Sequence, residues 1–548
     1  MLNRNREIAN SNKCVSGEIV GIGEEVNKEY ILNNIILDDL ALGHKNRAYW
    51  IHDLEFYELA YNCIGISALD IIKNKEYSFS RAIRKLNREI VKITNSQSGG
   101  IGFINFDTDM STYLKDESDK EIIELISEFF NDLNMFVRKG CERPYVTFNF
   151  GLDESYNGRR FSKLLLKAYE LGDENSKPFV FPNLVFKIKD GVNKKESDKN
   201  FDIFNLSCSL TAKNMIPTYL NCDSSLNKNL NASKLGVMGC RTRVYNNLFG
   251  EDTSKNRGNI ACVTINLVQA AIKSNGSIDA FKEEIKNVMN KAKKLLVHRF
   301  NTLCKSGSFN CIRELGIYLD YDKSNKEMLR NGTLSIGFIG LWDSISVLFD
   351  KKLTKDDILY KYRDLAYSIV EFMKDIINSY KEQDLLNFSL LASAAEGVSG
   401  RFPAYDKEKY KEFNSKFNKE YYTNSFHVPV DLELNYFEKL SIEGIFHKLC
   451  DGGSISYVEL SEIPSHNIEG VKEIIDFACE NDCNYIGINF PLDICNNCDS
   501  VGEFNMVCDY CGSDDILRLR RVSGYLSSTS NFTKGKKAEL CDRVAHLV

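Results

Sequence analysis

The most informative segment of this 548-residue chain is Arg521-Val522-Ser523-Gly524-Tyr525-Leu526, close to its end. It follows two cysteine pairs, Cys495-x2-Cys498 and Cys508-x2-Cys511. Glycine reaches backbone angles that other residues cannot adopt, and a four-cysteine module directly before this glycine would hold its loop in place. We therefore expect a stiff C-terminal module that holds Gly524 in a defined position.

The four cysteines have the spacing of a metal site. Each pair places two thiolates on a tight turn, and four sulfurs can close around a tetrahedral Zn²⁺ at roughly 2.3 Å. Such a site has no open position, so Cys495, Cys498, Cys508 and Cys511 are predicted to hold a structural zinc ion. Iron in a rubredoxin-like site is the main alternative. A zinc ribbon that binds nucleic acid is a further reading, but Asp499–Asp515 contains no basic residue.

Composition indicates a large cytoplasmic protein. Hydrophobic residues make up 43% of the chain, and the net charge of −6 comes without a basic block, which argues against a nucleic-acid surface. The polar start, MLNRNREIANSNK, does not resemble a secretory leader, and no apolar run is long enough for a membrane span. The 17 cysteines suggest reduced thiols, and most of them, such as Cys262 and Cys479, are expected to be inert core residues.

Periodicity predicts alternating helices and strands, and hence an α/β fold. Helical spacing is clearest in residues 121–137, 278–301 and 358–380. Short apolar runs bounded by Gly, Asn or Pro predict strands at 145–150, 184–188, 260–267, 333–338 and 485–490. Pro491 is a plausible boundary, so we expect a catalytic domain over residues 1–490 and a small module over 491–548.

The sequence around Gly524 resembles the loop that carries the stable backbone radical of glycyl radical enzymes. A radical at Cα is stabilised when it is planar and conjugated with both neighbouring amides, and only glycine has no Cβ to crowd that geometry. The four-cysteine motif precedes this loop, and Asn531-x3-Gly535-Lys536 and Glu539-x3-Arg543-x2-His546 follow it. This layout is similar to the C-terminus of the class III (anaerobic) ribonucleoside-triphosphate reductases.

Segments along nearly the whole chain resemble the same family in the expected order. Trp50 stands where the family has the first His of its early motif, which is a departure. The matching segments are Trp50–Leu54, Tyr61–Ile64, Ser96–Gly100, Asn105–Asp107, Asn149–Gly151, Gly158-Arg159, Phe181–Lys187, Met238–Thr242, Arg257–Asn259, Thr264–Leu267, Gly337–Leu341, Ala395–Gly397 and Tyr422–Ser425.

The resemblance implies a ten-stranded α/β barrel of two five-stranded halves, with a finger loop through its centre. Cys240, at the tip of that loop, would exchange the radical with Gly524 and then attack the 3′ position of the ribose. Cys63 would supply hydrogen to C2′ from the opposite face. Asn266, or less favourably Asn259, would hydrogen-bond the sugar hydroxyls or the co-reductant. The alternatives are a small buried residue for Cys240 and a strand-end cap for Asn266.

The resemblance also implies partners and cofactors. Formate is the expected electron source, and the alternative is a thioredoxin-like protein with an extra thiol such as Cys208 or Cys222. Because the chain has no CxxxCxxC motif, the S-adenosylmethionine and the iron–sulfur cluster would belong to a separate activase. We expect a homodimer with dNTP or ATP effectors. Since the His52 segment comes early, we expect no N-terminal ATP-cone and no overall inhibition by dATP.

Two other readings compete with the reductase. A different glycyl radical enzyme would share the radical loop, but a formate-lyase-like enzyme needs adjacent cysteines, and eliminases use Cys-x-Glu. This chain has Cys240-Arg241-Thr242 and the four-cysteine motif. A non-catalytic zinc-ribbon protein would carry no radical.

Overall fold

The computed structural model describes Asn10, residues 14–411 and residues 419–546. The polar start that argued against a secretory leader lies outside the described residues, apart from Asn10. In this part of the chain, no helix is both long and apolar enough to pass through a bilayer.

Two sets of five parallel strands form the main sheet, and the sets run antiparallel to each other. The first set is β2 (Cys63–Ile66), β3 (Ile101–Phe103), β4 (Val146–Phe150), β5 (Asn183–Ile188) and β6 (Thr218–Asn221). The second set is β9 (Arg257–Asn266), β10 (Thr333–Ile339), β11 (Asn387–Ala392), β12 (Ser456–Glu459) and β13 (Tyr485–Asn489). A short edge strand, β1 (Tyr49–Ile51), pairs with β9.

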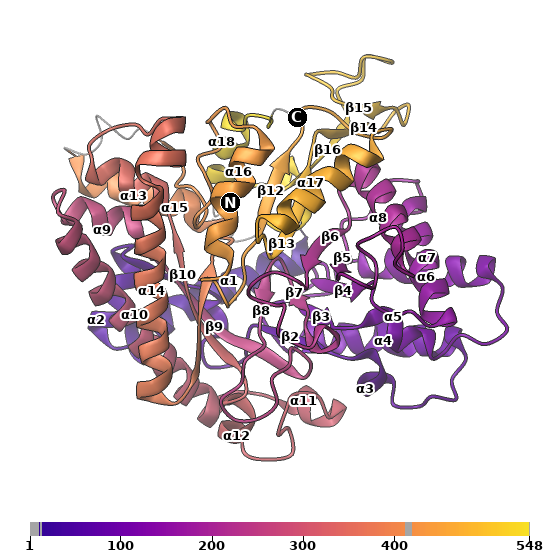
Figure 1. Cartoon of the computed structure of the whole chain (residues 1–548). Coiled ribbons are helices and arrows are strands. Elements are labelled where there is room, and N and C mark those ends of the chain that lie inside the picture. Colours follow the sequence, from indigo (N-terminus) through magenta and orange to yellow (C-terminus); the bar gives the residue numbers. More distant parts are fainter. Residues whose placement is uncertain (1–9, 11–13, 412–418, 547–548) are drawn as a thin grey trace.

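The two ends of this sheet meet. A parallel bridge joins Leu391 of β11 to Gly453, just before β12, and the Ala392 N–H donates to the Gly453 carbonyl at 3.0 Å. The ten strands thus surround a central space, as the resemblance predicted. Figure 1 shows the two short strands β7 (Val237–Met238) and β8 (Thr242–Arg243) in the middle of the molecule, between the halves. They form the finger hairpin that presents Cys240.

Helices cover the outside of both halves (Figure 1). Those of the first half are α3 (Ala68–Ile72), α4 (Phe79–Thr94), α5 (Phe106–Ser111), α6 (Asp119–Leu133), α7 (Tyr156–Leu171) and α8 (Phe201–Asn214). Those of the second half are α9 (Leu267–Lys273), α10 (Ile278–Ser306), α11 (Asn310–Leu315), α12 (Asn325–Leu329), α13 (Leu341–Leu348), α14 (Arg363–Asp384), α15 (Val398–Lys409), α16 (Tyr436–His447) and α17 (Ile468–Glu480). Near the ends of the chain lie α1 (Val15–Tyr30), α2 (Asp38–Lys45) and α18 (Lys534–Asp542).

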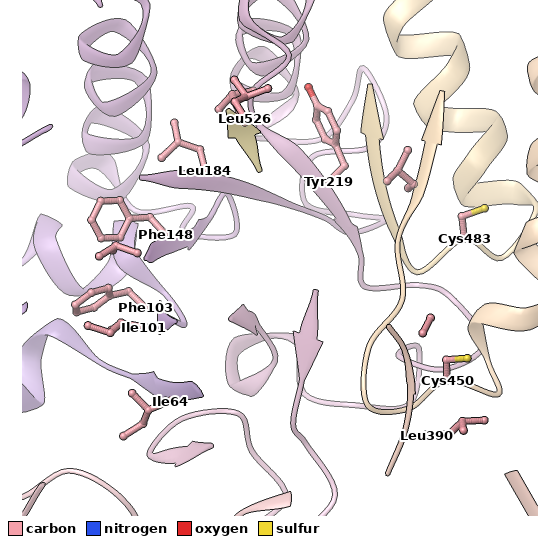
Figure 2. Close-up of a cluster of buried hydrophobic side chains, with 14 of the residues drawn as sticks. Ile64, Ile101, Phe103, Phe148, Leu184, Tyr219, Leu390, Cys450, Cys483 and Leu526 are labelled. Atoms are coloured by element: carbon pink, nitrogen blue, oxygen red, sulfur yellow. The ribbon is translucent and has the colours of Figure 1, made fainter. Parts of the chain in front are cut away.

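The strands are largely apolar because both of their faces are buried, the outer face under the helices and the inner face inside the barrel. Every residue of β2, β3, β4, β5 and β6 is buried. Figure 2 shows core side chains from successive strands lying side by side, among them Ile64, Ile101, Phe103, Phe148 and Leu184. This burial explains why short apolar runs were enough to locate the strands.

The five predicted strands are confirmed with small shifts at their ends, as are the three predicted helices. The helix predicted over 121–137 ends at Leu133, because the Asn134 side chain donates to the Phe130 carbonyl and closes the last turn. The helix predicted over 358–380 begins with a separate π-helical turn, Asp357–Lys361, before α14.

The C-terminal segment forms its own four-stranded sheet in the order β15-β14-β16-β17. Its strands are β14 (Leu492–Cys495), β15 (Val501–Gly502), β16 (Ile516–Arg521) and β17 (Leu526–Ser528). Figure 1 shows it at one edge of the molecule, beside α17. The main sheet ends at Asn489 and this sheet begins at Leu492, on either side of the predicted boundary at Pro491. That residues 491–548 form a separate domain stays a prediction.

Candidate active site

Gly524 lies at the tip of a hairpin made by β16 and β17. Arg521 pairs with Leu526 across the hairpin, and the Val522 N–H donates to the Tyr525 carbonyl at 3.1 Å. The β16 strand also pairs with β14, which ends at Cys495. The four-cysteine module is therefore continuous with the strand that leads into the loop, as the sequence predicted.

The finger hairpin brings Cys240 to the same place. The Asn149 side chain fixes β7, since its amide donates to the Val237 carbonyl at 3.0 Å and accepts from the Val237 N–H at 2.9 Å. Gly239, before the cysteine, has a φ of 58°, a left-handed conformation that glycine adopts without strain. Arg241, after it, donates to the Ser523 carbonyl at 3.1 Å and ties the finger to the glycine hairpin.

Gly524 and Cys240 are in direct contact. A Cβ built on Gly524 would lie 2.5 Å from the Cys240 Cβ and 2.7 Å from its Cα. Since a Cβ is one bond of about 1.5 Å from its Cα, the Gly524 Cα lies within about 4 Å of the Cys240 Cβ. A side chain at position 524 would overlap the finger, so the close approach requires glycine.

Cys240 opens onto a cavity of about 270 Å³. Cys63 and Cys262 also line it, together with His52, Asp53, Asn62, Ser98 and Glu396. The Cys63 thiol donates to the Asn62 side-chain oxygen at 2.8 Å, and its sulfur accepts from the Gly100 N–H at 3.2 Å. The structure thus brings together three of the predicted site residues, namely Gly524, Cys240 and Cys63.

Burial keeps the cavity thiols protonated. It raises the pKa of Cys63 to about 12 and that of Cys262 to about 12, because a thiolate is poorly solvated there. It also raises the pKa of Cys240, although the neighbouring Arg241 charge acts in the opposite direction. At neutral pH each sulfur therefore keeps the S–H bond that hydrogen-atom transfer needs.

Cys262 does not lie in the closed core that its apolar sequence neighbours predicted. It was expected to be an inert core thiol, but it lines the cavity with Cys63 and Cys240. It lies on β9 two residues before Thr264, whose hydroxyl is hydrogen-bonded to the His52 ring at 2.8 Å. Side chains alternate along a strand, so Cys262 and Thr264 lie on the same face. This alternation is the sequence signal that could have indicated a position of Cys262 near the His52 segment. The thiols weighed before, Cys208 and Cys222, lie elsewhere in buried clusters.

The structure does not bring Asn266 to the cavity. Its side chain caps α9 by accepting from the Gln269 N–H at 3.1 Å. The amide nitrogen donates to the Arg47 carbonyl and, at 2.8 Å, to Asp406. These partners occupy the side-chain atoms that would contact a sugar. Asn266 therefore fits a cap at the end of its strand better than a substrate contact. Asn259 donates to the Thr333 and Ser335 hydroxyls and does not line the cavity either.

The four cysteines of the C-terminal module fit a metal ion. Their sulfurs all lie within 4.8 Å of one another, with 3.5 Å between Cys495 and Cys511 and 3.7 Å between Cys498 and Cys508. Sulfurs bound tetrahedrally to Zn²⁺ at about 2.3 Å are separated by about 3.8 Å. The set is therefore compatible with a zinc site.

We expect one zinc ion per chain by elemental analysis, and none in Cys508→Ala, because a three-sulfur site leaves the metal open to water and chelators. Cys541→Ala is the matched control, since Cys541 is an exposed cysteine outside the cluster. Zinc in equal amounts in both variants would contradict the assignment.

Sequence similarity places nearly the whole chain in one enzyme family. The family model described as "Anaerobic ribonucleoside-triphosphate reductase" matches residues 7–546. The chain is 31% identical over 461 residues to the anaerobic ribonucleoside-triphosphate reductase of Escherichia coli, covering 80% of this chain but 64% of that protein. It is 26% identical to the enzyme of the same name from Enterobacteria phage T4, over 94% of this chain and 93% of the phage protein.

A solved structure agrees in fold. The anaerobic ribonucleotide reductase from Thermotoga maritima, in complex with dATP and CTP, superposes with a TM-score of 0.76 at 18% identity. The alignment covers 96% of this chain and 92% of the Thermotoga chain. It supports the barrel with its central finger.

Proposed function

The chain belongs to the anaerobic ribonucleoside-triphosphate reductase family, and on this premise we propose that it reduces ribonucleoside triphosphates to 2′-deoxyribonucleoside triphosphates by glycyl and thiyl radical chemistry. The observation that carries the proposal is the contact of Gly524 with Cys240, on the wall of a cavity that Cys63 also lines. Hydrogen-atom transfer reaches only a few ångströms, and the contact meets this requirement.

The proposed steps give each of the three residues a separate role. Activation removes one α hydrogen atom from Gly524, and the glycyl radical then takes the hydrogen atom of the Cys240 thiol. The Cys240 thiyl abstracts the 3′ hydrogen of the ribose, which makes loss of the 2′ hydroxyl as water much easier. Cys63 supplies a hydrogen atom to C2′, and after the electron source has supplied the second reducing equivalent, Cys240 gives the abstracted hydrogen atom back to C3′. The Cys240 thiyl that forms again takes a hydrogen atom from Gly524, which is feasible because S–H and C–H bonds have similar strengths.

The reduction needs two electrons, and the cavity suggests their source. In the formate route, formate and a proton yield CO₂ and water as the sugar is reduced. In the dithiol route, two thiols become a disulfide, and their two hydrogen atoms reduce the sugar while its 2′ hydroxyl leaves as water. Formate stays a prediction, but Cys262, which lines the same cavity as Cys63, favours the dithiol route. We therefore propose that Cys63 and Cys262 form the disulfide, which an external dithiol then reduces.

A single-turnover experiment separates the two routes. Activated, pre-reduced protein given CTP without formate is expected to yield about one dCTP per radical-bearing site and one new disulfide. Cys262→Ala should yield none. Cys304→Ala should behave as wild type, because Cys304 is a half-buried cysteine of α10 outside the cavity. A strict need for formate, with one labelled CO₂ released per dCTP, would contradict the dithiol route.

The remaining partners are proposed from the family. The Thermotoga relative binds dATP and CTP, and we propose ribonucleoside triphosphates as substrates and dNTP or ATP as effectors of this chain. A separate S-adenosylmethionine-dependent iron–sulfur activase would generate the radical, and a homodimer is the proposed assembly. The zinc ion would stiffen the module that leads into the Gly524 hairpin.

Anaerobic activation followed by EPR spectroscopy and a CTP reduction assay tests the function. We expect a glycyl doublet together with dCTP. A doublet without nucleotide reduction would favour another glycyl radical enzyme, such as a lyase or eliminase. The absence of both would favour a non-catalytic zinc ribbon.

A further inference from the structure

One carboxylate contacts both neighbours of the glycine. Glu396 Oε1 accepts from the Ser523 hydroxyl at 2.7 Å, and Oε2 accepts from the Tyr525 hydroxyl at 2.9 Å. The three side chains are buried, and Ser523 and Tyr525 are each 1% exposed. A carboxylate has two acceptor oxygens and no donor, so it can hold two hydroxyl groups at once.

The carboxylate comes from the barrel, whereas the hydroxyls come from the C-terminal hairpin. Glu396 lies in the turn between β11 and α15. Its backbone carbonyl also accepts from the Thr533 hydroxyl, at 2.8 Å, just before α18. A short turn of the barrel thus holds the C-terminal segment on both sides of position 524.

The hairpin tip has two other kinds of contact. Arg241 donates to the Ser523 carbonyl at 3.1 Å and Arg521 to the Gly524 carbonyl at 3.3 Å, so these two bonds hold the backbone, whereas Glu396 holds the two side chains. The Tyr525 ring stacks on Phe181 and meets Tyr145 edge to face, with ring centroids 5.7 and 5.0 Å away. These apolar contacts bury the ring but leave its hydroxyl direction open. Hydrogen bonds to a charged acceptor are shorter and roughly twice as strong as neutral ones, and they fix direction.

We propose that Glu396 is the clamp of the radical loop, a positioning residue that holds Ser523 and Tyr525 and thereby sets Gly524 against Cys240. The effect of this clamp on catalysis rests on the proposed function. The clamp itself is a property of the resting protein, and it can be measured without a radical.

Amide hydrogen–deuterium exchange in the unactivated protein tests the clamp. Glu396→Gln replaces two charge-assisted bonds by neutral ones, and Glu396→Ala removes both. We expect exchange at residues 522–526 to rise by about ten-fold in the glutamine variant and further in the alanine variant. Exchange in β4 and β5, which belong to the barrel core, should stay at the wild-type rate. Wild-type exchange at 522–526 in both variants would overturn the proposal.

Variants on the hairpin side test whether the same bonds are responsible. Tyr525→Phe and Ser523→Ala each remove one hydroxyl, and each should raise exchange at 522–526. Adding Tyr525→Phe to Glu396→Ala should have little further effect, because the partner is already lost. Ser528→Ala is the matched control, since this hydroxyl bonds to Ser530 and not to Glu396. Fully additive effects of the Glu396 and Tyr525 variants would contradict a shared contact.

A second measurement links the clamp to the radical. Because Glu396 lines the cavity, slower turnover alone would not distinguish a clamp from a contact with substrate. We expect activated Glu396→Gln to lose its glycyl signal in air several-fold faster than wild type, with chain cleavage at Gly524. Equal rates would contradict the clamp. If activated wild type shows no glycyl signal, the proposed function fails, whereas the exchange result stands independently.

Discussion

Gly524→Ala is expected to give a protein with no glycyl doublet and no CTP reduction. Alanine lacks the second α hydrogen of glycine, and its methyl group crowds the planar radical. The same methyl group would lie 2.5 Å from the Cys240 Cβ, so the hairpin tip must move away from the finger. Loss of the radical and displacement of the hairpin tip both lower activity, and we expect activity to fall by at least about a thousand-fold. EPR spectroscopy after anaerobic activation and the CTP assay measure them together.

Gly250→Ala is the matched control for this variant. A Cβ at Gly250 would have its nearest neighbour at 3.5 Å, which is an ordinary contact. It should keep the wild-type radical yield and activity. Substantial dCTP formation by Gly524→Ala would contradict storage of the radical at this position.

Cys240→Ala is expected to separate the two functions of the site. The radical should still form on Gly524, because activation acts on the glycine, but dCTP formation should fall by at least about a thousand-fold. No sulfur would then be present at the finger tip to abstract the 3′ hydrogen. EPR spin counting and the CTP assay on the same activated sample check both parts.

The Cys240→Ala result is informative because its folding cost should be small. Cys240 is half-buried and faces the cavity, so removal of its sulfur leaves no closed void in the core. Wild-type dCTP formation by this variant would contradict the thiyl assignment. Loss of the radical as well would show that the variant disturbs the loop, and thermal unfolding would then measure that disturbance.

The strands could be predicted because they are buried on both faces, whereas their closure into a barrel was suggested only by the resemblance to a family. A strand such as Thr333–Ile339 is buried along its whole length, so most of its residues must be apolar. A short apolar run in the sequence therefore indicates such a strand directly. The cysteine pairs are equally local, because each pair sits on a single turn. The position of Gly524 beside Cys240 depends on a contact between distant segments, and only the resemblance to a family suggested it.

The parts that could not be predicted depend on which partner a side chain finds. Asn266 is polar at the end of a strand, and nothing in its neighbourhood indicates that Asp406 and Arg47 would use its amide. Glu396 stood out in a short motif, but the hydroxyls that it accepts from lie on the C-terminal hairpin. Cys262 looked like core because its sequence neighbours are apolar, whereas its own face opens onto the cavity.

The unpaired electron on Gly524 should lie against Cys240, and ¹³C electron–nuclear double resonance can detect this contact. Activated protein carrying cysteine labelled at Cβ should show a weak dipolar ¹³C coupling to the glycyl radical, because the Cys240 Cβ lies within about 4 Å of the Gly524 Cα. We expect this coupling in the labelled wild type and its disappearance in labelled Cys240→Ala. Identical spectra from the two proteins would contradict it.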